Sequence, residues 1–173
     1  EKLACFGLTE ASGGSSPADM QTSAEAVPDG YLINGRKMFI TLGEVADYVC
    51  IVARTGDRHT AFMVEKGTPG YEPGRRERVV GVRSIPVNEL VFTGCRVPAA
   101  NRLGNEGTGL AAALATISAI ARPGVASIAL GVARGSFDIA VRFAKERRLS
   151  GNAIINLQAI QFSLADMETD IEA

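Results

Sequence analysis

Two short segments combine residue types that could bind a flat ligand carrying phosphate. Leu8 to Ser16 (LTEASGGSS) brings glycines and hydroxyls together, so backbone N–H groups and side chains could hold an anion or an extended ligand. An ordinary Ser/Gly loop is the simpler interpretation, because such clusters mark loops first. Lys37 to Gly43 (KMFITLG) places Phe39 and Thr41 two residues apart, on one face of a predicted strand. The ring could cover a heterocycle and the hydroxyl could bond to its edge, but a core phenylalanine and a strand-forming threonine are an equally natural interpretation.

Three later segments are weaker candidates. Gly104 to Gly109 (GNEGTG) precedes a predicted helix, but its spacing is not GxGxxG, which favours a flexible joint between domains. Lys145 to Gly151 (KERRLSG) places two arginines at the end of that helix. They could bind a phosphate group, or they could simply interact with the negative C-terminal end of the helix dipole. Arg122 lies at the edge of an apolar helix face. A buried arginine paired with another group and an arginine exposed to solvent are two equally open interpretations of this position.

Composition excludes several classes of protein. Hydrophobic residues make up 46% of the 173 residues and charged residues 21%, which is globular composition. Eighteen basic residues against nineteen acidic ones give a net charge of -1, so binding to a nucleic-acid backbone is not expected. Arg122 and Arg134 interrupt the longest apolar region, so no membrane span is expected.

Cysteine and histidine exclude more. Cys5, Cys50 and Cys95 lie far apart and form no CxxC, which favours a reducing compartment without disulfides. His59 is the only histidine and lies in a predicted polar turn. A His-centred metal site or a Ser-His-Asp triad is therefore not expected, and no metal is predicted.

The first part of the chain, residues 1–103, reads as strands and turns. Asn34-Gly35 predicts a hairpin inside Tyr31 to Thr41, and Asp29-Gly30 predicts a second tight turn just before it. Further strands are expected at Asp47 to Arg54, Ala61 to Glu65 and Asn88 to Thr93. Turn residues recur about every ten positions, which is typical of an all-β sandwich or barrel.

The second part, residues 104–173, has a helical period. Apolar residues at spacings of three and four predict a helix near forty residues long, with a kink at Pro123, ending near Arg148. Gly151-Asn152 breaks the pattern, and a last helix is expected from about Asn156. The whole chain is thus α+β and multidomain: a β-domain followed by part of an antiparallel helical bundle, whose apolar stripe needs other helices to cover it.

The two ends of the sequence suggest a piece of a longer chain. Glu1 is not an initiator methionine, and Ala173 ends an apolar stripe with no Gly, Asn or Pro to stop the helix. We expect the natural chain to extend at both ends.

The order of these segments resembles the acyl-CoA dehydrogenase family. The matching segments run, in order, LTEASGGSS, NGRKMFITLG, ADYVCIVART, AFMVEKGTPGY, VGVRSIPVNELVFTGCRVP, LGNEGTGL, IARPGVASIALGVARGSFDIAVRFAKERR and LQAIQFSLADM. The resemblance implies the family's middle β-domain and the first part of its C-terminal four-helix domain. It also implies an enzyme of fatty acid β-oxidation that binds FAD and oxidises an acyl-CoA between Cα and Cβ, passing electrons to an electron-transfer flavoprotein.

The resemblance assigns roles to particular residues. Leu8, Thr9, Gly14 and Ser15 would contact the flavin ring and pyrophosphate, and Ser15 would also line the CoA channel. Phe39 stands where the family usually has Trp over the flavin, and Thr41 would bond near N5.

Further roles belong to the helical part. Arg122 would anchor the helix beside the active site, while Arg147 and Gln158 would reach the FAD of a neighbouring subunit. This implies a dimer or a tetramer.

The chain also departs from the family pattern. Ser118-Ala119 replaces a common Phe-Asp that holds pantetheine, Ser150 replaces an aromatic residue, and Leu42 replaces Asn or Ser. Ala121 stands where a minority of members carry the catalytic Glu, so the general base is expected beyond Ala173.

Two alternatives remain open. One is a relative with altered chemistry, such as a flavin oxidase, a desulfinase-like enzyme or an enzyme acting on a carrier-protein thioester. The other is a non-catalytic member retained for assembly. We expect a cytoplasmic location, or the mitochondrial matrix if the source is eukaryotic.

Overall fold

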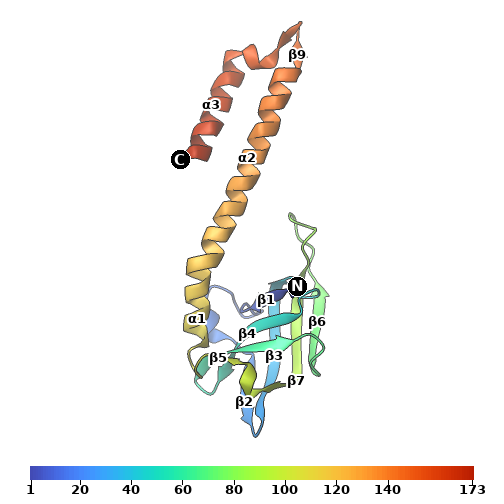
Figure 1. The fold of residues 1–173 in the computed structure, drawn as a ribbon, viewed down its shortest axis with the longest axis vertical. Helices are drawn as coiled ribbons and strands as arrows, with labels where there is room; N and C mark the ends of the chain where they lie inside the picture. Colours follow the sequence, from blue (N-terminus) through green and yellow to red (C-terminus); the bar gives the residue numbers. More distant parts are fainter. The chain divides into compact units, whose positions relative to one another are not determined.

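The computed structural model describes residues 1–173 as two compact units, Glu1–Ala115 and Thr116–Ala173. The first unit is built mainly from strands (Figure 1). Its eight strands are β1 (Ala4–Gly7), β2 (Ser23–Val27), β3 (Gly30–Thr41), β4 (Tyr48–Thr55), β5 (Arg58–Glu65), β6 (Tyr71–Arg76), β7 (Val87–Pro98) and β8 (Arg102–Leu103). The three strands predicted after the hairpin region are confirmed as β4, β5 and β7.

These strands form one sheet with the order β6-β7-β3-β2-β4-β5-β8, and β1 pairs with β4 in parallel. The sheet does not close, because β6 and β8 remain unpaired ends. It nevertheless wraps around one core: the rings of Tyr31 on β3 and Phe62 on β5 lie 4.7 Å apart, although two strands separate β3 from β5 in the sheet. The predicted β-domain followed by a helical part is confirmed, but the predicted sandwich or barrel takes the form of one open, curved sheet rather than a closed barrel.

The predicted hairpin at Asn34-Gly35 is wrong. The turn lies at Pro28-Asp29, where Val27 pairs with Gly30, and β3 then runs without a break to Thr41. Asn34 instead faces a bulge on β7, where its side-chain oxygen accepts the N–H of Gly94 at 2.7 Å. Because β3 has partners on both sides, a reversal inside it would leave two rows of backbone groups unpaired.

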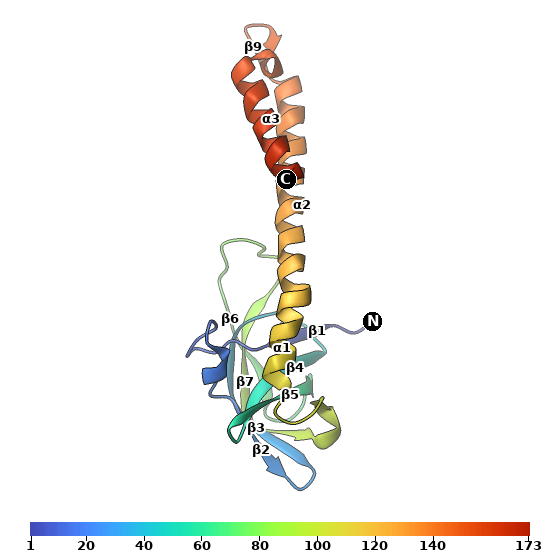
Figure 2. The same ribbon diagram turned by 90° about the vertical axis from the view of Figure 1, so that its left-hand side faces the viewer.

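The second unit is helical (Figure 2). Helix α1 (Gly109–Thr116), which begins in the first unit, runs through a π-helical turn (Ile117–Ala121) into α2 (Arg122–Glu146). A short hairpin of β9 (Arg148–Leu149) and β10 (Asn152–Ala153) and a 3₁₀ turn (Ile154–Asn156) lead to α3 (Gln158–Glu172). The predicted long helix, the break at Gly151-Asn152 and the last helix are confirmed, with α3 starting two residues after the expected position.

The irregularity predicted at Pro123 takes the form of this π-helical turn, which ends two residues before the proline. Proline has no N–H to bond to the carbonyl four residues earlier, and its ring crowds that carbonyl. A π turn widens the backbone at that point and removes the conflict.

Helices α2 and α3 pack against each other as an antiparallel pair, side by side in both ribbon views. Arg134 on α2 donates to Glu168 at 3.0 Å and also bonds to Glu172, so one guanidinium holds two successive turns of α3. Much of the apolar stripe of α2 is uncovered, with Val125, Ile128 and Val132 about two thirds exposed.

By length and composition, the continuous helix Gly109–Glu146 could cross a membrane: it has 38 residues and a window of mean hydropathy 1.5. Arg122 and Arg134 therefore do not exclude a membrane span by composition, contrary to the expectation from the sequence. One such helix is weak evidence for a span, because the core helices of bundles have the same composition.

Candidate functional site

The loop Leu8–Ser16 is fixed against the end of β3. The carbonyl of Thr9 accepts the N–H of Met38 at 2.8 Å, and Glu10 and Gly13 exchange two backbone hydrogen bonds of 3.3 and 3.1 Å. Leu8 is buried, whereas Gly14 and Ser15 are exposed. The loop is thus a tight turn whose buried side faces β3 and whose glycines and hydroxyls face outward.

A buried ion pair lies beneath this loop. The ammonium nitrogen of Lys37 lies 2.8 Å from Oε1 of Glu10 and 3.2 Å from the carbonyl oxygen of Leu8, and the lysine is completely buried. The Glu10 carboxylate also accepts the backbone N–H groups of Gln21 at 2.5 Å and Thr22 at 3.1 Å. Every charged atom of the pair therefore has a partner, as a buried pair requires.

Electrostatics keep Glu10 ionised. Burial alone would raise the pKa of Glu10, but hydrogen bonds from Lys37, Thr22 and Gln21, with the attraction of the ammonium, together hold it below its usual value. Burial lowers the pKa of Lys37, and the neighbouring Glu10 opposes that shift. The carboxylate is thus a structural anion rather than a proton acceptor, as we infer from its saturated hydrogen bonds.

The end of β3 carries a second unusual feature. Between Lys37 and Ile40, β3 has one residue more than its partner β7, and Phe39 occupies the left-handed region with φ of 58°. Its ring is 60% exposed, and Thr41 is also exposed. Leu42 follows in the same left-handed region, with φ of 65°. Non-glycine residues rarely adopt this backbone, and such strain is concentrated at functional sites.

Sequence proximity brings the two features together, because Met38, which binds Thr9, immediately precedes Phe39. The loop and the bulge thus adjoin at the end of β3. Close packing restricts the loop further: a Cβ on Gly14 would lie 3.2 Å from Cγ2 of Thr9. An exposed ring beside an exposed loop of glycine and serine residues can accept a flat heterocycle with a polar or anionic extension.

The predicted site residues of the second unit lie at the two ends of α2 and at the start of α3. Arg122 begins α2, is exposed, and lies at the hydrogen-bond limit of 3.5 Å from the hydroxyl of Ser118. Arg147 ends α2: its N–H bonds to Phe143 and its carbonyl to Ile154, while its side chain is exposed. Gln158, the first residue of α3, is also exposed. These side chains have the freedom to meet a ligand or another subunit.

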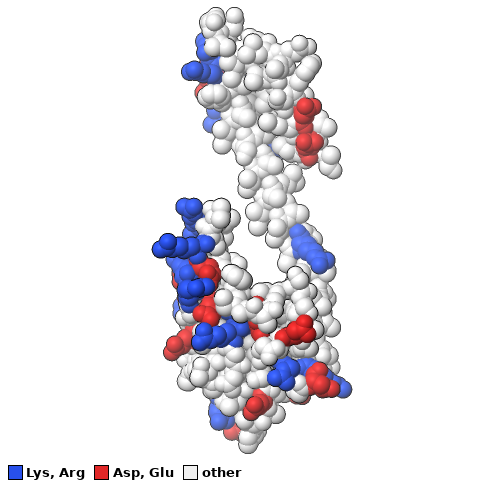
Figure 3. All heavy atoms as spheres, turned by 180° about the vertical axis from the view of Figure 1, so that it is seen from behind, with Lys and Arg blue, Asp and Glu red and all other residues white.

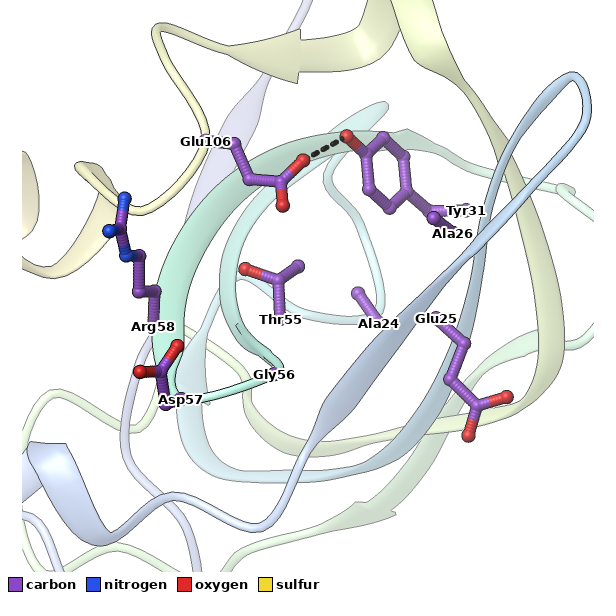
Figure 4. A pocket seen from close by; sticks show the side chains of 9 residues that line it. All are labelled: Ala24, Glu25, Ala26, Tyr31, Thr55, Gly56, Asp57, Arg58 and Glu106. Atoms are coloured by element: carbon purple, nitrogen blue, oxygen red, sulfur yellow. Dashed lines mark hydrogen bonds between the residues drawn. The ribbon is translucent and has the colours of Figure 1, made fainter.

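A separate hollow of the first unit lies away from this loop. An open pocket of about 490 Å³ lies between β2, the β4–β5 turn and the segment around Glu106 (Figure 4). Tyr31 donates to Glu106 across it at 2.8 Å, and Arg58 stands near Asp57 at its edge. Three carboxylates against one arginine make this pocket a poor host for phosphate, and it contains none of the predicted site residues.

Other reactive groups are few. The three cysteines are free, and burial raises the pKa of Cys5 and Cys95 to about 11, so both remain thiols at neutral pH. His59 lies on β5 rather than in a turn, and its Nε2 is 3.0 Å from the carbonyl oxygen of Ala18. No group of three or more His, Cys, Asp or Glu side chains is placed to hold a metal ion.

Comparison with known proteins places the chain in a family. Residues 5–95 match the model of the acyl-CoA dehydrogenase middle domain, and residues 107–173 match the model of the acyl-CoA dehydrogenase C-terminal domain. The fold, the loop beside the β3 bulge and these two matches define the class: the chain belongs to the acyl-CoA dehydrogenase family.

Individual relatives agree. The chain is 42% identical over 178 residues to the short-chain specific acyl-CoA dehydrogenase of Megasphaera elsdenii, covering 99% of this chain and 46% of that protein. It matches the solved butyryl-CoA dehydrogenase of the same organism with a TM-score of 0.96 and 41% identity, over 99% and 46% of the two chains. The glutaryl-CoA dehydrogenase of Mycobacterium smegmatis, solved in complex with FADH2, matches with a TM-score of 0.90 and 35% identity, over 98% and 44%. The chain thus spans about half the length of the curated relatives it matches.

The structure adds Lys37 and Glu10 to the candidate residues as a pair. A signal for Lys37 was present: Tyr31, Ile33, Gly35 and Lys37 alternate along β3, and the first two are buried. A charged residue continuing a buried face requires a buried partner. Nothing in the sequence identifies Glu10 as that partner, because the contact joins residues 27 positions apart.

Proposed function

We propose that this chain is the flavin-holding part of an FAD-dependent acyl-CoA dehydrogenase, which oxidises an acyl-CoA thioester between Cα and Cβ. The observation that carries the proposal is the exposed, left-handed Phe39 directly beside the anchored loop Leu8–Ser16. Membership of the family and the FADH2 complex of a relative support the choice of cofactor.

The residues present fit FAD. Phe39 offers an exposed aromatic face, and Thr41 offers an exposed hydroxyl two residues further on. Leu8, Thr9, Gly14 and Ser15 belong to a loop in which Gly14 is exposed and has no Cβ, so the loop backbone at this point can approach a pyrophosphate. This set matches the two chemical parts of the cofactor, a flat ring system and an anionic tail.

When bound, FAD would supply the hydride acceptor for the β-hydrogen of the substrate. The chain's own residues would then have three tasks. Phe39 would cover one face of the ring system and exclude water, Thr41 would donate a hydrogen bond at its edge, and the loop would hold the phosphates. Ser15 would also line the channel for the CoA part of the substrate.

The α-proton requires a carboxylate base, and no residue of this chain can be named as that base. Ala121 occupies the position where some relatives carry it, and Glu10 is saturated by its buried contacts. We infer that the base lies in the remainder of the natural protein. Arg122, exposed at the start of α2, would anchor the helix beside that substrate site.

Partners and location belong to the same proposal. Arg147 and Gln158 would contact the cofactor of a neighbouring subunit, so the full protein would be a dimer or a tetramer. Its electrons would pass to an electron-transfer flavoprotein. The protein would act in the cytoplasm, or in the mitochondrial matrix of a eukaryote. Native mass spectrometry of the full-length protein tests the subunit number directly.

A relative with altered chemistry is the second candidate. Ser118 and Ala119 stand in the π-helical turn where the family commonly has residues that hold pantetheine, and Ser118 instead lies near Arg122. A carrier-protein thioester or another flavin reaction would fit that change.

The visible spectrum of the full-length protein separates these functions. We expect a bound-flavin spectrum that bleaches anaerobically with one member of a panel of acyl-CoAs. A flavin that stays oxidised with every acyl-CoA would favour the altered-chemistry relative. A colourless protein that cannot be reconstituted with FAD would leave only a role in assembly.

Thr41→Val tests the hydrogen bond at the ring edge. We expect FAD to remain bound, while its reduction by substrate slows by about tenfold, the value of one hydrogen bond that strengthens in the transition state. Stopped-flow bleaching measures this rate. Thr93→Val, at an exposed position on β7, is the matched control and should leave the rate unchanged. Equal reduction rates in the two variants would contradict the role of Thr41.

A further inference from the structure

We propose that the buried Glu10–Lys37 pair is a positioning pair that sets the shape of the flavin-facing surface by locking the loop Leu8–Ser16 to β3. This inference rests on the proposed function, because it assigns the pair to the flavin site. Neither residue faces the ligand: both side chains are nine-tenths or more buried, beneath the loop.

The ammonium of Lys37 reaches two residues of the loop. It bonds to the carbonyl of Leu8 at 3.2 Å and to the side chain of Glu10 at 2.8 Å, the two residues on either side of Thr9. Thr9 itself is held by its carbonyl to the N–H of Met38. Three consecutive loop residues are thus fixed to two consecutive strand residues, with the lysine supplying two of the three contacts.

The carboxylate of Glu10 also holds the far end of the loop segment. Beyond Gly13 the chain leaves β3 and returns at Gln21 and Thr22, whose backbone N–H groups are both taken by the carboxylate of Glu10. No strand pairing joins the two ends of this segment, because β1 ends at Gly7 and β2 begins at Ser23. The Glu10 side chain therefore accepts the backbone hydrogen bonds that a neighbouring strand would accept in a β-sheet.

Lys37 lies on β3 directly before the bulge. Lys37 pairs with Leu90, and the extra residue of β3 is accommodated before Ile40, with Phe39 in left-handed backbone between them. A slip of β3 by one residue would move Lys37 out of its ion pair and leave Glu10 buried and unpaired. The pair therefore fixes where the bulge forms, and so where the Phe39 ring emerges.

A merely structural pair would behave differently. Its loss would lower the stability of the folded protein but leave the affinity of the folded protein for FAD unchanged. A positioning pair would lower the affinity and alter the environment of the bound flavin, even when the fold persists.

The test uses the full-length protein and the variant Glu10→Gln/Lys37→Met, which removes both charges together and so leaves neither unpaired. The matched control is Arg36→Met/Glu89→Gln, an ion pair of 3.1 Å on β3 and β7 whose arginine is the neighbour of Lys37 but points to solvent. The measurements are FAD affinity by fluorescence titration, visible circular dichroism of bound FAD, and hydrogen exchange of the Gln21, Thr22 and Met38 amides in the apoprotein.

We expect the pair variant to bind FAD at least tenfold more weakly than the control, with a changed flavin dichroism band and at least tenfold faster exchange of those amides. Equal affinity and an identical band in the two variants would overturn the proposal. If the double variant does not fold, Glu10→Asp, which keeps both charges but shortens the carboxylate arm, replaces it. Unchanged FAD affinity in Glu10→Asp would then overturn the proposal.

The outcomes separate this inference from the proposed function. A wild-type protein that binds no FAD would overturn the proposed function and the inference with it. A wild-type protein that binds FAD, beside a pair variant that binds it as well as the control does, would overturn the inference alone.

Discussion

Glu10 and Lys37 show how two residues that are individually unfavourable in a core become favourable together. An isolated buried charge costs several kcal/mol, but here each charge meets the other and the carboxylate also accepts backbone N–H groups. Removing one partner is therefore far more disruptive than removing an exposed one. The same contacts make the stability of the first unit depend on pH.

Glu10→Gln should destabilise the protein by about 3 kcal/mol at neutral pH, because Lys37 loses its carboxylate. Since the folded-state pKa of Glu10 lies below the ordinary value of 4.5, its contribution is present above that value and is lost as the pH falls through the lowered pKa. The difference between wild type and variant should therefore shrink in acid. Urea unfolding at pH 7, 5 and 3.5 measures it, and a difference that stays constant over this range would contradict the assignment.

Gly35 lies where the backbone of Thr22 approaches β3 too closely for a side chain. Its φ of 146° lies outside the range of most side chains, and a Cβ there would come within 2.6 Å of Cα of Thr22. Gly35→Ala should lower the free energy of unfolding by about 2–3 kcal/mol, by strain and overpacking together. Gly56→Ala is the control: its φ of 60° is also positive, but a Cβ there meets nothing within 4 Å. Equal losses in the two variants, measured by urea unfolding, would contradict the packing argument.

At the scale of elements, the sequence predicted those strands and helices whose signals lie within one continuous segment. The strand β4, rich in β-branched residues, and the helix stripe with spacings of three and four were both predictable, because their signals repeat along one segment. Asn34-Gly35 was misleading because the same dipeptide that forms a hairpin turn also suits a position opposite a bulge. Which one forms is decided by the long-range partners of β3, and sequence spacing does not carry that information.

In the candidate site, too, the residue types were predictable from the sequence, whereas the contacts between them were not. Glycines, hydroxyls and an aromatic ring identified the loop and the end of β3 as candidates, but their contact through Thr9 and Met38 joins residues 29 positions apart along the chain. The left-handed backbone of Phe39 depends on a bulge against β7, which no local pattern announces.

The turn of the β9–β10 hairpin carries a serine at a position that favours asparagine. Ser150 and Gly151 both have positive φ, 50° and 84°, which defines a type I′ turn, for which Asn-Gly is preferred. Ser150→Asn should therefore stabilise this hairpin by about 0.5–1 kcal/mol, because Asn tolerates the left-handed region better than Ser. Gly151→Ala should have the opposite sign, and thermal unfolding compares the two. A destabilised Ser150→Asn variant would contradict this assignment.

At the scale of the whole chain, the two units differ in how complete they are. The sheet of the first unit encloses its own core, with Ile33, Val49 and Phe62 fully buried. The second unit buries only Ala144. On the face shown in Figure 3, most of the surface of the second unit is uncharged, whereas charged side chains crowd the first unit.

The uncovered stripe of α2 therefore predicts self-association when residues 1–173 are produced alone. Val125, Ile128 and Val132 are 66%, 65% and 65% exposed, and covering one such side chain contributes about 1.5–3 kcal/mol. In a symmetric pair both chains contribute these three side chains, so covering the stripe favours association as the protein concentration rises. Light scattering during gel filtration should show masses above 18.2 kDa that increase with concentration.

Replacing the same three residues with serine should return this chain to a monomer, because serine leaves no apolar stripe to cover. Leu130→Ser, on the same helix and 52% exposed but outside the three- and four-residue spacing of the stripe, is the control and should still associate. A wild-type chain that stays monomeric at every concentration would mean that the stripe is solvated without a partner. The long apolar helix would then need a different explanation, such as the membrane span that its length and composition permit.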